Sequence, residues 1–188
     1  MICGFLPALN IVGEKESGTI EQINVTPVKK WVFILSKLIP YWTIGLFVLS
    51  VAMLIARFFW GLIPEGSLLT IYFFAVLFVM AFSGFGLVIS NYAQTMQQAM
   101  FMMFFFVLTF IFLSGLYTPV ENIPLWAQRI SDVSPLKYNI QVMRMVYLKG
   151  TGMKELVKPM IFLIGYAAFF YSWAILIYNK RAKKCNMK

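Results

Sequence analysis

The side chains that could carry out acid–base or metal chemistry are few and far apart in this sequence. The chain contains no histidine, the commonest general base and metal ligand, and only seven aspartates and glutamates. These carboxylates lie in separate polar segments, without the close pair that acid–base hydrolysis requires. The two cysteines, Cys3 and Cys185, belong to no CxxC pair, so we expect neither a disulfide nor a metal site.

Nucleotide chemistry is not expected from this chain either. It lacks the GxxxxGK[ST] loop that cradles phosphates, so any ATP and magnesium used in its function should be bound by another polypeptide. Charged residues inside membrane spans usually mark ion or proton pathways, and the expected spans contain none, with Lys37 at the edge of one of them. This disfavours a cation channel or a proton-coupled carrier built by this chain alone.

The elements that must position these residues are strongly apolar. Hydrophobic residues make up 61% of the 188 residues and charged residues 12%, whereas soluble domains carry about 25% charged residues. Residues 66–120 contain no charged side chain at all. A helix crosses the bilayer core with about 20 apolar residues, so this stretch predicts two crossings joined by a turn.

The same pattern predicts four complete spans, at 38–56, 68–90, 99–117 and 160–178, with Pro40 in the first turn of the first span. Residues 2–12 are apolar but cover only half a bilayer, which is typical of the end of a longer helix. We therefore expect an all-α polytopic transmembrane helix bundle, forming a single domain over residues 1–188. In this bundle a partial N-terminal helix precedes about four complete spans.

One long polar interruption, 118–158, should lie outside the membrane core. Its residues 136–148 have the pattern of a helix lying in the membrane surface. Apolar side chains share one face of that helix, namely Ile140, Met143 and Tyr147. Polar side chains share another face, namely Lys137, Gln141 and Arg144. Pro119, Pro124 and Pro135 allow two interpretations. They either belong to an ordinary loop or stiffen an interfacial hairpin that dips into the outer leaflet and closes an exit.

Orientation follows from the basic cluster at 180–184, which holds four cations in five positions and belongs on the cytoplasmic side. With four spans, the polar segment 14–30 returns to the cytoplasm, like the C-terminal tail. Lys and Arg residues flank the apolar segments instead of forming one basic face. Anionic lipid headgroups are therefore the expected partner of the net charge of +9, and nucleic acid is not.

Small residues recur within the second span, at Ser83, Gly84, Gly86 and Ser90. Close helix packing is the favoured interpretation, and a substrate-lining role is the alternative. For the run Phe104 to Phe106, a lipid-facing surface is the favoured interpretation, and an aromatic drug site is the alternative.

Two segments together resemble the permease subunits of type-2 ABC transporters. Residues 14–27, EKESGTIEQINVTP, are similar to the family's cytoplasmic loop between its second and third transmembrane helices, which reaches the ATPase subunit. Residues 114–126, SGLYTPVENIPLW, continue to SPLKY at 134–138 and to Arg144. They are similar to the family's outer segment between the fifth and sixth helices.

The resemblance implies two groups of site residues. The ATPase-coupling loop would consist of Glu14, Lys15, Glu16, Ser17, Gly18, Thr19, Glu21, Gln22 and Pro27. The outer hairpin or gate would consist of Gly115, Pro119, Pro124, Trp126, Pro135 and Arg144. From the residues alone, 14–22 suits a short surface helix that presents Glu14, Glu16 and Glu21 to a partner's basic groove, with an ordinary solvated loop as the alternative.

The closest branch is that of bacterial multidrug efflux permeases, in which two permeases and two ATPases assemble. The resemblance implies a multi-pass subunit of the bacterial cell membrane that exports a small or amphipathic substrate by alternating access. The resemblance also implies that this subunit pairs with an ABC ATPase and with a second permease copy or paralogue. The family pattern would place a first helix and an extracytoplasmic region before residue 1, so the resemblance implies a fragment, a misassigned start or a truncated member of the family. The rivals are a non-transporting scaffold or degenerate permease remnant and, third, a membrane-embedded enzyme.

Overall fold

The computed structural model describes residues 2–18, 30–61, 64–116, 124–132, 134–150 and 153–185, and within these ranges all regular structure is helical. The helices are α1 (Ile2–Glu16), α3 (Lys30–Trp60), α4 (Leu68–Tyr92), α5 (Met96–Leu113), α6 (Leu125–Ser131), α7 (Pro135–Lys149), the short 3₁₀ helix η2 (Met153–Leu156) and α8 (Val157–Cys185).

Four of these helices are long and apolar enough to cross a membrane. The qualifying stretches are Ile34–Trp60, Leu68–Tyr92, Met96–Leu113 and Val157–Ala174. Each overlaps one of the four spans predicted from hydropathy, although α5 ends at Leu113 and not at the predicted residue 117. The all-α, polytopic fold class is confirmed.

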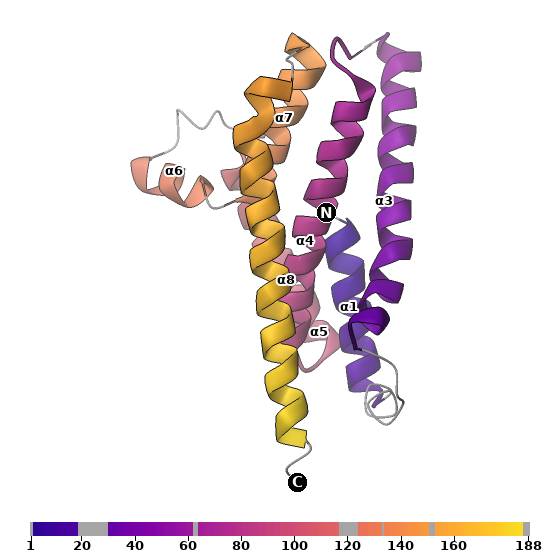
Figure 1. Ribbon diagram of the computed structural model, residues 1–188, viewed down its shortest axis with the longest axis vertical. Helices are drawn as coiled ribbons and strands as arrows, with labels where there is room; N and C mark the ends of the chain where they lie inside the picture. The colour runs from indigo at the N-terminus through magenta and orange to yellow at the C-terminus, as the bar shows by residue number, and fades with distance from the viewer. Residues whose placement is uncertain are drawn as a thin grey trace.

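Helix α4 forms the centre of the bundle, with α1 and α8 as its most extensively packed neighbours (Figure 1). Its Phe74 and Phe82 side chains are fully buried, and Phe85 makes edge contacts with aromatic rings of α5 and α8. The small residues Ser83, Gly84, Gly86 and Ser90 are all buried. Because they lie against α1 and α8 inside the bundle, the structure supports the packing interpretation of these residues.

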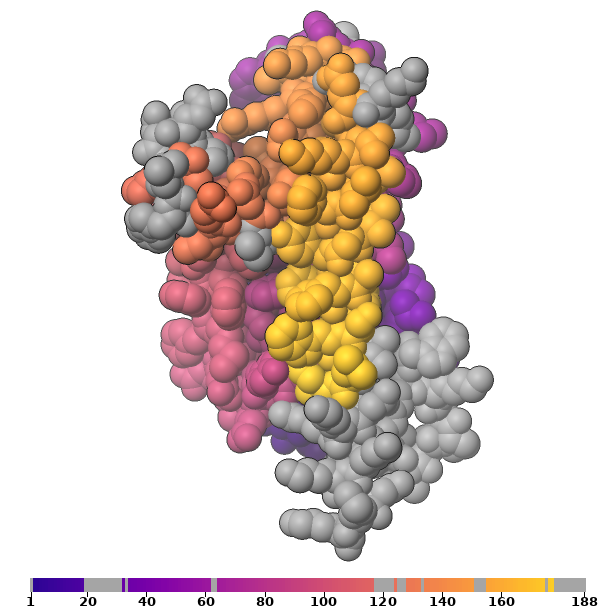
Figure 2. Space-filling model, turned by 60° about the vertical axis from the view of Figure 1, so that its left-hand side comes forward, coloured from indigo at the N-terminus to yellow at the C-terminus, as the bar shows by residue number. Residues whose placement is uncertain are grey.

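Helices α3 and α5 expose most of their apolar surface. Phe58 and Phe59 of α3 are at least 80% exposed, and Phe104, Phe105 and Phe106 of α5 are all exposed. Helix α8 lies along one face of the molecule, where its side chains form a continuous column (Figure 2). Burial in a soluble core would not leave such side chains outside, whereas a lipid environment accepts them.

Several helices extend beyond the predicted spans. Helix α3 begins at Lys30, so Pro40 lies in its interior and not in its first turn, which corrects that expectation. Helix α8 continues through the basic cluster to Cys185, and α1 continues to Glu16. Hydropathy marks only the part of a helix that matches the bilayer core, and charged residues can prolong a helix beyond it.

The long polar interruption contains two helices. Helix α6 was not predicted, and it projects from the side of the bundle (Figure 1). Helix α7 was predicted, but it packs against α4 and α8 more deeply than expected of a helix lying in the membrane surface. Its Val142 and Val146 side chains are fully buried, with Ile140 and Met143 partly buried beside them.

The bundle has two distinct ends. At the lower end in Figure 1, α1 finishes, α3 begins, α4 turns into α5, and α8 reaches the C-terminus. At the upper end, the backbone N–H groups of Glu65 and Gly66 donate to the carbonyls of Tyr147 and Val146, which joins the start of α4 to the end of α7. The described ends of segment 14–30, residues 14–18 and Lys30, thus lie at the same end of the bundle as the end of α8.

Candidate functional site

Three consecutive side chains at the end of α1 contact three different elements at the lower end of the bundle. Glu14 contacts α3, Lys15 contacts the end of α4, and Glu16 contacts the start of α5. All three were predicted to belong to a coupling loop. We call these residues and their contacts the α1 clamp.

Glu14 forms a salt bridge with Lys37 of α3, and both side chains are largely shielded from solvent. Lys37 is the cation that the sequence places at the edge of the first span. An ion pair that is partly withdrawn from water is screened less than a surface pair, so this contact fixes α1 against α3 more firmly than an exposed pair would.

Lys15 and Glu16 contact the two helix ends that meet between α4 and α5. The Lys15 ammonium donates to the carbonyl of Ala93, the C-cap residue of α4. The Glu16 carboxylate accepts the backbone N–H of Met96, the first residue of α5, at 2.8 Å. A cation at a helix C-terminus and an anion at a helix N-terminus both complement the helix dipoles.

The remaining coupling-loop residues are only partly described. Ser17 is exposed and its hydroxyl donates to the carbonyl of Glu14, while Gly18 has a φ of +76°, the left-handed conformation that glycine adopts readily. Thr19, Glu21, Gln22 and Pro27 lie outside the described residues.

The expected short surface helix over 14–22 is not what the described part shows. Residues 14–16 are the last turn of α1, and the side chains of Glu14 and Glu16 contact the chain's own α3 and α5. The sequence pattern could not reveal these partners, because they lie far along the chain.

Some of the predicted gate residues lie close together where the polar segment 118–158 meets the end of α5. The Arg144 guanidinium of α7 donates to the carbonyl of Gly115, which follows α5 and has a φ of +78°. Pro135 is the buried first residue of α7, and Pro124 is the exposed residue before α6. Pro119 and the side chain of Trp126 are not among the described parts of the chain.

Further contacts hold this outer hairpin, and sequence reasoning missed them. The buried Ser131 hydroxyl donates to the carbonyl of Leu113 at 2.6 Å, which joins α6 to the end of α5. The hydroxyls of Tyr138 and Tyr166 both donate to the carbonyl of Asp132, at 3.1 Å each. Burial, followed by the negative charge of Asp132, raises the pKa of Tyr138, so its phenol keeps the proton that this contact needs.

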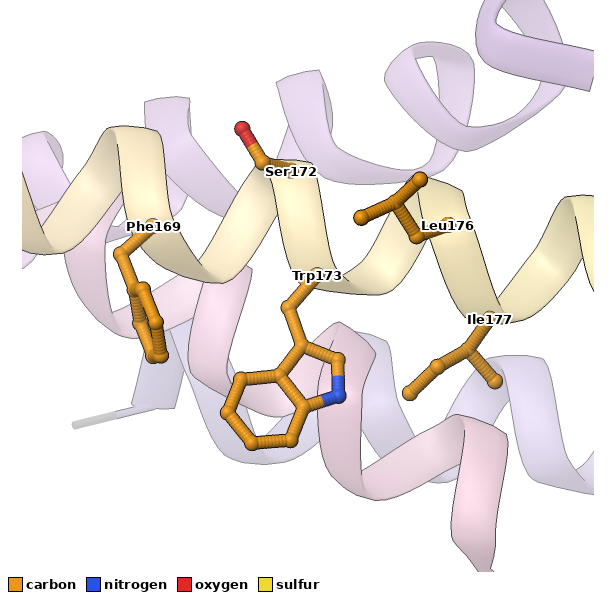
Figure 3. A pocket seen from close by; sticks show the side chains of 5 residues that line it. All are labelled: Phe169, Ser172, Trp173, Leu176 and Ile177. Carbon is orange, nitrogen blue, oxygen red and sulfur yellow. The ribbon is translucent and has the colours of Figure 1, made fainter.

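A shallow groove on α8 is lined by Phe169, Ser172, Trp173, Leu176 and Ile177, which all come from this one helix (Figure 3). Its lining is almost entirely apolar and contains no charged side chain. The groove therefore suits lipid chains and offers no anchor for a charged ligand.

Comparisons with known proteins agree with this geometry. The family model described as "ABC-2 type transporter" matches residues 1–148. The chain is 32% identical over 146 residues to the probable multidrug ABC transporter permease YbhR of Escherichia coli, a match that covers 78% of the chain and 40% of that relative.

Two further Escherichia coli proteins are similar. The probable multidrug ABC transporter permease YbhS is 30% identical over 177 residues, which covers 90% of the chain and 45% of that protein. The inner membrane transport permease YhhJ is 24% identical over 184 residues, with 96% and 48% covered. The chain thus spans less than half the length of these relatives. No solved structure shows a significant match to the chain.

Proposed function

The chain belongs to the ABC-2 type transporter family, and on that premise we propose that it acts as a membrane-spanning permease subunit of an ATP-driven exporter. ATP and magnesium bind to a separate ABC ATPase subunit, and the permease itself catalyses no reaction. The relatives YbhR and YbhS are named as probable multidrug permeases, which favours a small or amphipathic substrate for this chain.

The observation that carries this proposal is the α1 clamp. The clamp connects the start of the proposed coupling loop to α3 through Glu14, to α4 through Lys15 and to α5 through Glu16. A coupling loop needs such contacts with the bundle, because a motion confined to the loop would leave the helices unchanged.

We place the lower end of the bundle in the cytoplasm, since α8 continues there into the cationic cluster 180–184. Lys15 and Glu16 then lie on the side where ATP is available. The outer hairpin, held by Arg144 and Ser131, lies at the opposite side of the membrane and closes the exit in the resting state.

Transport of this kind requires two states of the bundle, inward-open and outward-open. Nucleotide binding can shift their populations only if the ATPase contacts the segment after α1 differently in the two states. A second permease, either a copy or a paralogue, completes the pathway, as in the bacterial multidrug efflux permeases that this chain resembles.

Glu21→Lys tests the proposal at a residue of the proposed coupling loop that is not one of the three α1 residues of the clamp. The permease is purified with its ATPase in lipid nanodiscs, and ATP hydrolysis is measured with and without the permease. We expect the unmodified permease to alter the hydrolysis rate and Glu21→Lys to abolish that effect, since it reverses a charge in the loop that faces the ATPase.

Glu155→Lys, at the exposed upper end, is the matched control and should behave like the unmodified protein. Two results together would exclude the proposed role. The permease and the ATPase would fail to co-purify, and the rate of ATP hydrolysis would be the same with and without the permease.

A further inference from the structure

Residues 93–95 form the connector between α4 and α5. It is a true break between helices: Ala93 and Thr95 have extended backbone conformations, with ψ of 139° and 153°. Helix ends leave backbone carbonyls and N–H groups without partners in the helix itself. The connector brings the carbonyl end of α4 next to the N–H end of α5.

The end of α1 supplies partners to both helix ends at once. Lys15 binds the carbonyl of Ala93 and Glu16 binds the N–H of Met96, so two adjacent residues of opposite charge face helix ends of opposite polarity. The start of α5 is completed by Thr95, whose hydroxyl accepts the N–H of Gln98 at 3.2 Å.

An apolar contact underlies these polar ones. Val12 of α1, Ala93 of the connector and Ala99 of α5 are fully buried and pack together. A side chain added at Gly13 would meet the Met96 side chain at 2.6 Å, so α1 and the start of α5 lie in close contact. The last turn of α1 and the connector are therefore packed together as one unit.

Of the two helices that meet at the connector, α5 is the less deeply packed. Most of α4 is buried in the centre of the bundle, whereas only Ala99 and Met103 of α5 are buried. Moving α4 would break many packing contacts, but tilting α5 about the connector breaks few. The helix that can tilt at lower cost is thus the one whose N-terminus Glu16 binds.

From these contacts we infer that Lys15 and Glu16 are positioning residues that make the α4–α5 connector the receiver of the ATPase-driven motion, with α5 as the helix that moves. This inference rests on the proposed function and adds the path by which motion enters the bundle. It also assigns different roles within the coupling motif, since Glu14 holds α1 to α3 while Lys15 and Glu16 transmit.

Labelling of α5 tests the inference. Gln97, which is exposed in the first turn of α5, is changed to cysteine in a Cys185→Ser background. The remaining cysteine, Cys3, is buried, so position 97 carries the accessible thiol. The permease–ATPase complex in nanodiscs is reacted with a charged maleimide, first without nucleotide and then with ATP and vanadate. We expect the labelling rate at position 97 to differ between the two nucleotide states.

Glu16→Ala and Lys15→Met should each abolish that difference while the complex still co-purifies. Glu16→Gln retains an acceptor oxygen for the Met96 N–H and should preserve it. Glu155→Ala and Arg57→Met, at exposed positions of the upper end, are the matched controls and should also preserve it.

The possible failures can be told apart. If the unmodified permease binds no ATPase, the proposed function fails and the inference falls with it. If the complex forms and hydrolyses ATP but Glu16→Ala and Lys15→Met keep the nucleotide-dependent difference in labelling, the inference alone is overturned.

Discussion

Ser83 lies where α3, α4 and α8 meet, and its single hydroxyl serves all three helices. It donates to the carbonyl of Met80 in its own helix, accepts the indole N–H of Trp42 at 3.2 Å, and bonds the hydroxyl of Tyr171 at 2.8 Å. A hydroxyl has one proton and two lone pairs, so every hydrogen-bonding position of Ser83 is used. In an apolar surrounding, this fixes how the three helices rotate against one another.

Ser83→Ala should therefore destabilise the bundle. It leaves the Trp42 indole N–H without its acceptor and the Tyr171 hydroxyl without its partner, at a cost of about 1–2 kcal/mol in the free energy of unfolding. Thermal unfolding in detergent, followed by tryptophan fluorescence, measures the change. Ser172→Ala, on the exposed face of α8, removes the same hydroxyl and should leave the unfolding temperature unchanged. Equal unfolding temperatures for the two variants would contradict this role of Ser83.

At this scale the sequence identifies residues better than it identifies their partners. Ser83 stands out as a small residue in an apolar span, and Glu16 as part of a charged motif. The contacts of Ser83 with Tyr171 and of Glu16 with Met96 join residues 88 and 80 positions apart. Periodicity and spacing report on neighbours along one helix, so they cannot predict which distant group completes a hydrogen bond.

At the scale of the helices, α1 and α4 approach one another through glycines. A Cβ atom added to Gly86 would lie 2.3 Å from the Gly4 carbonyl oxygen, which is backbone and cannot rotate away. Small residues permit such close approaches in membrane proteins, where van der Waals packing holds helices together. Any side chain at position 86 must push α1 away from α4.

Gly86→Ala is accordingly expected to lower the free energy of unfolding by about 1–3 kcal/mol, the usual cost of overpacking. Gly165→Ala is a matched control, because nothing lies within 4 Å of an added Cβ there. That control should keep or raise stability, since alanine favours helix by about 1 kcal/mol over glycine. Unfolding in detergent compares the two. A Gly86→Ala variant as stable as Gly165→Ala would show that α1 does not pack on α4 in this way.

The helices themselves were largely predictable, but their ends were not. Uninterrupted apolar stretches predict the four spans because the bilayer sets their length. The lower turns of α3, from Lys30, and the lower turns of α8 contain charged residues, so hydropathy excludes them although the helix continues. Helix α6 has only seven residues, too short for a periodic pattern to be recognised.

At the scale of the whole molecule, polar contacts concentrate at two places along the long axis. The α1 clamp lies at the lower end, and the outer hairpin is tied to α5 and α8 at the opposite side of the apolar helices. Helix α5 joins the two, since Glu16 holds its first residue and Ser131 binds the carbonyl of its last residue. A tilt of α5 would therefore link the coupling loop to the gate.

Photo-crosslinking in native membranes tests the placement of the ATPase most directly. A photoreactive amino acid is introduced at position 17, which is exposed next to the α1 clamp, or at position 155, which is exposed at the upper end. We predict that illumination joins the permease to an ABC ATPase from position 17 and not from position 155. Crosslinking to the ATPase from position 155 alone would contradict the proposed orientation and, with it, the role of the α1 clamp.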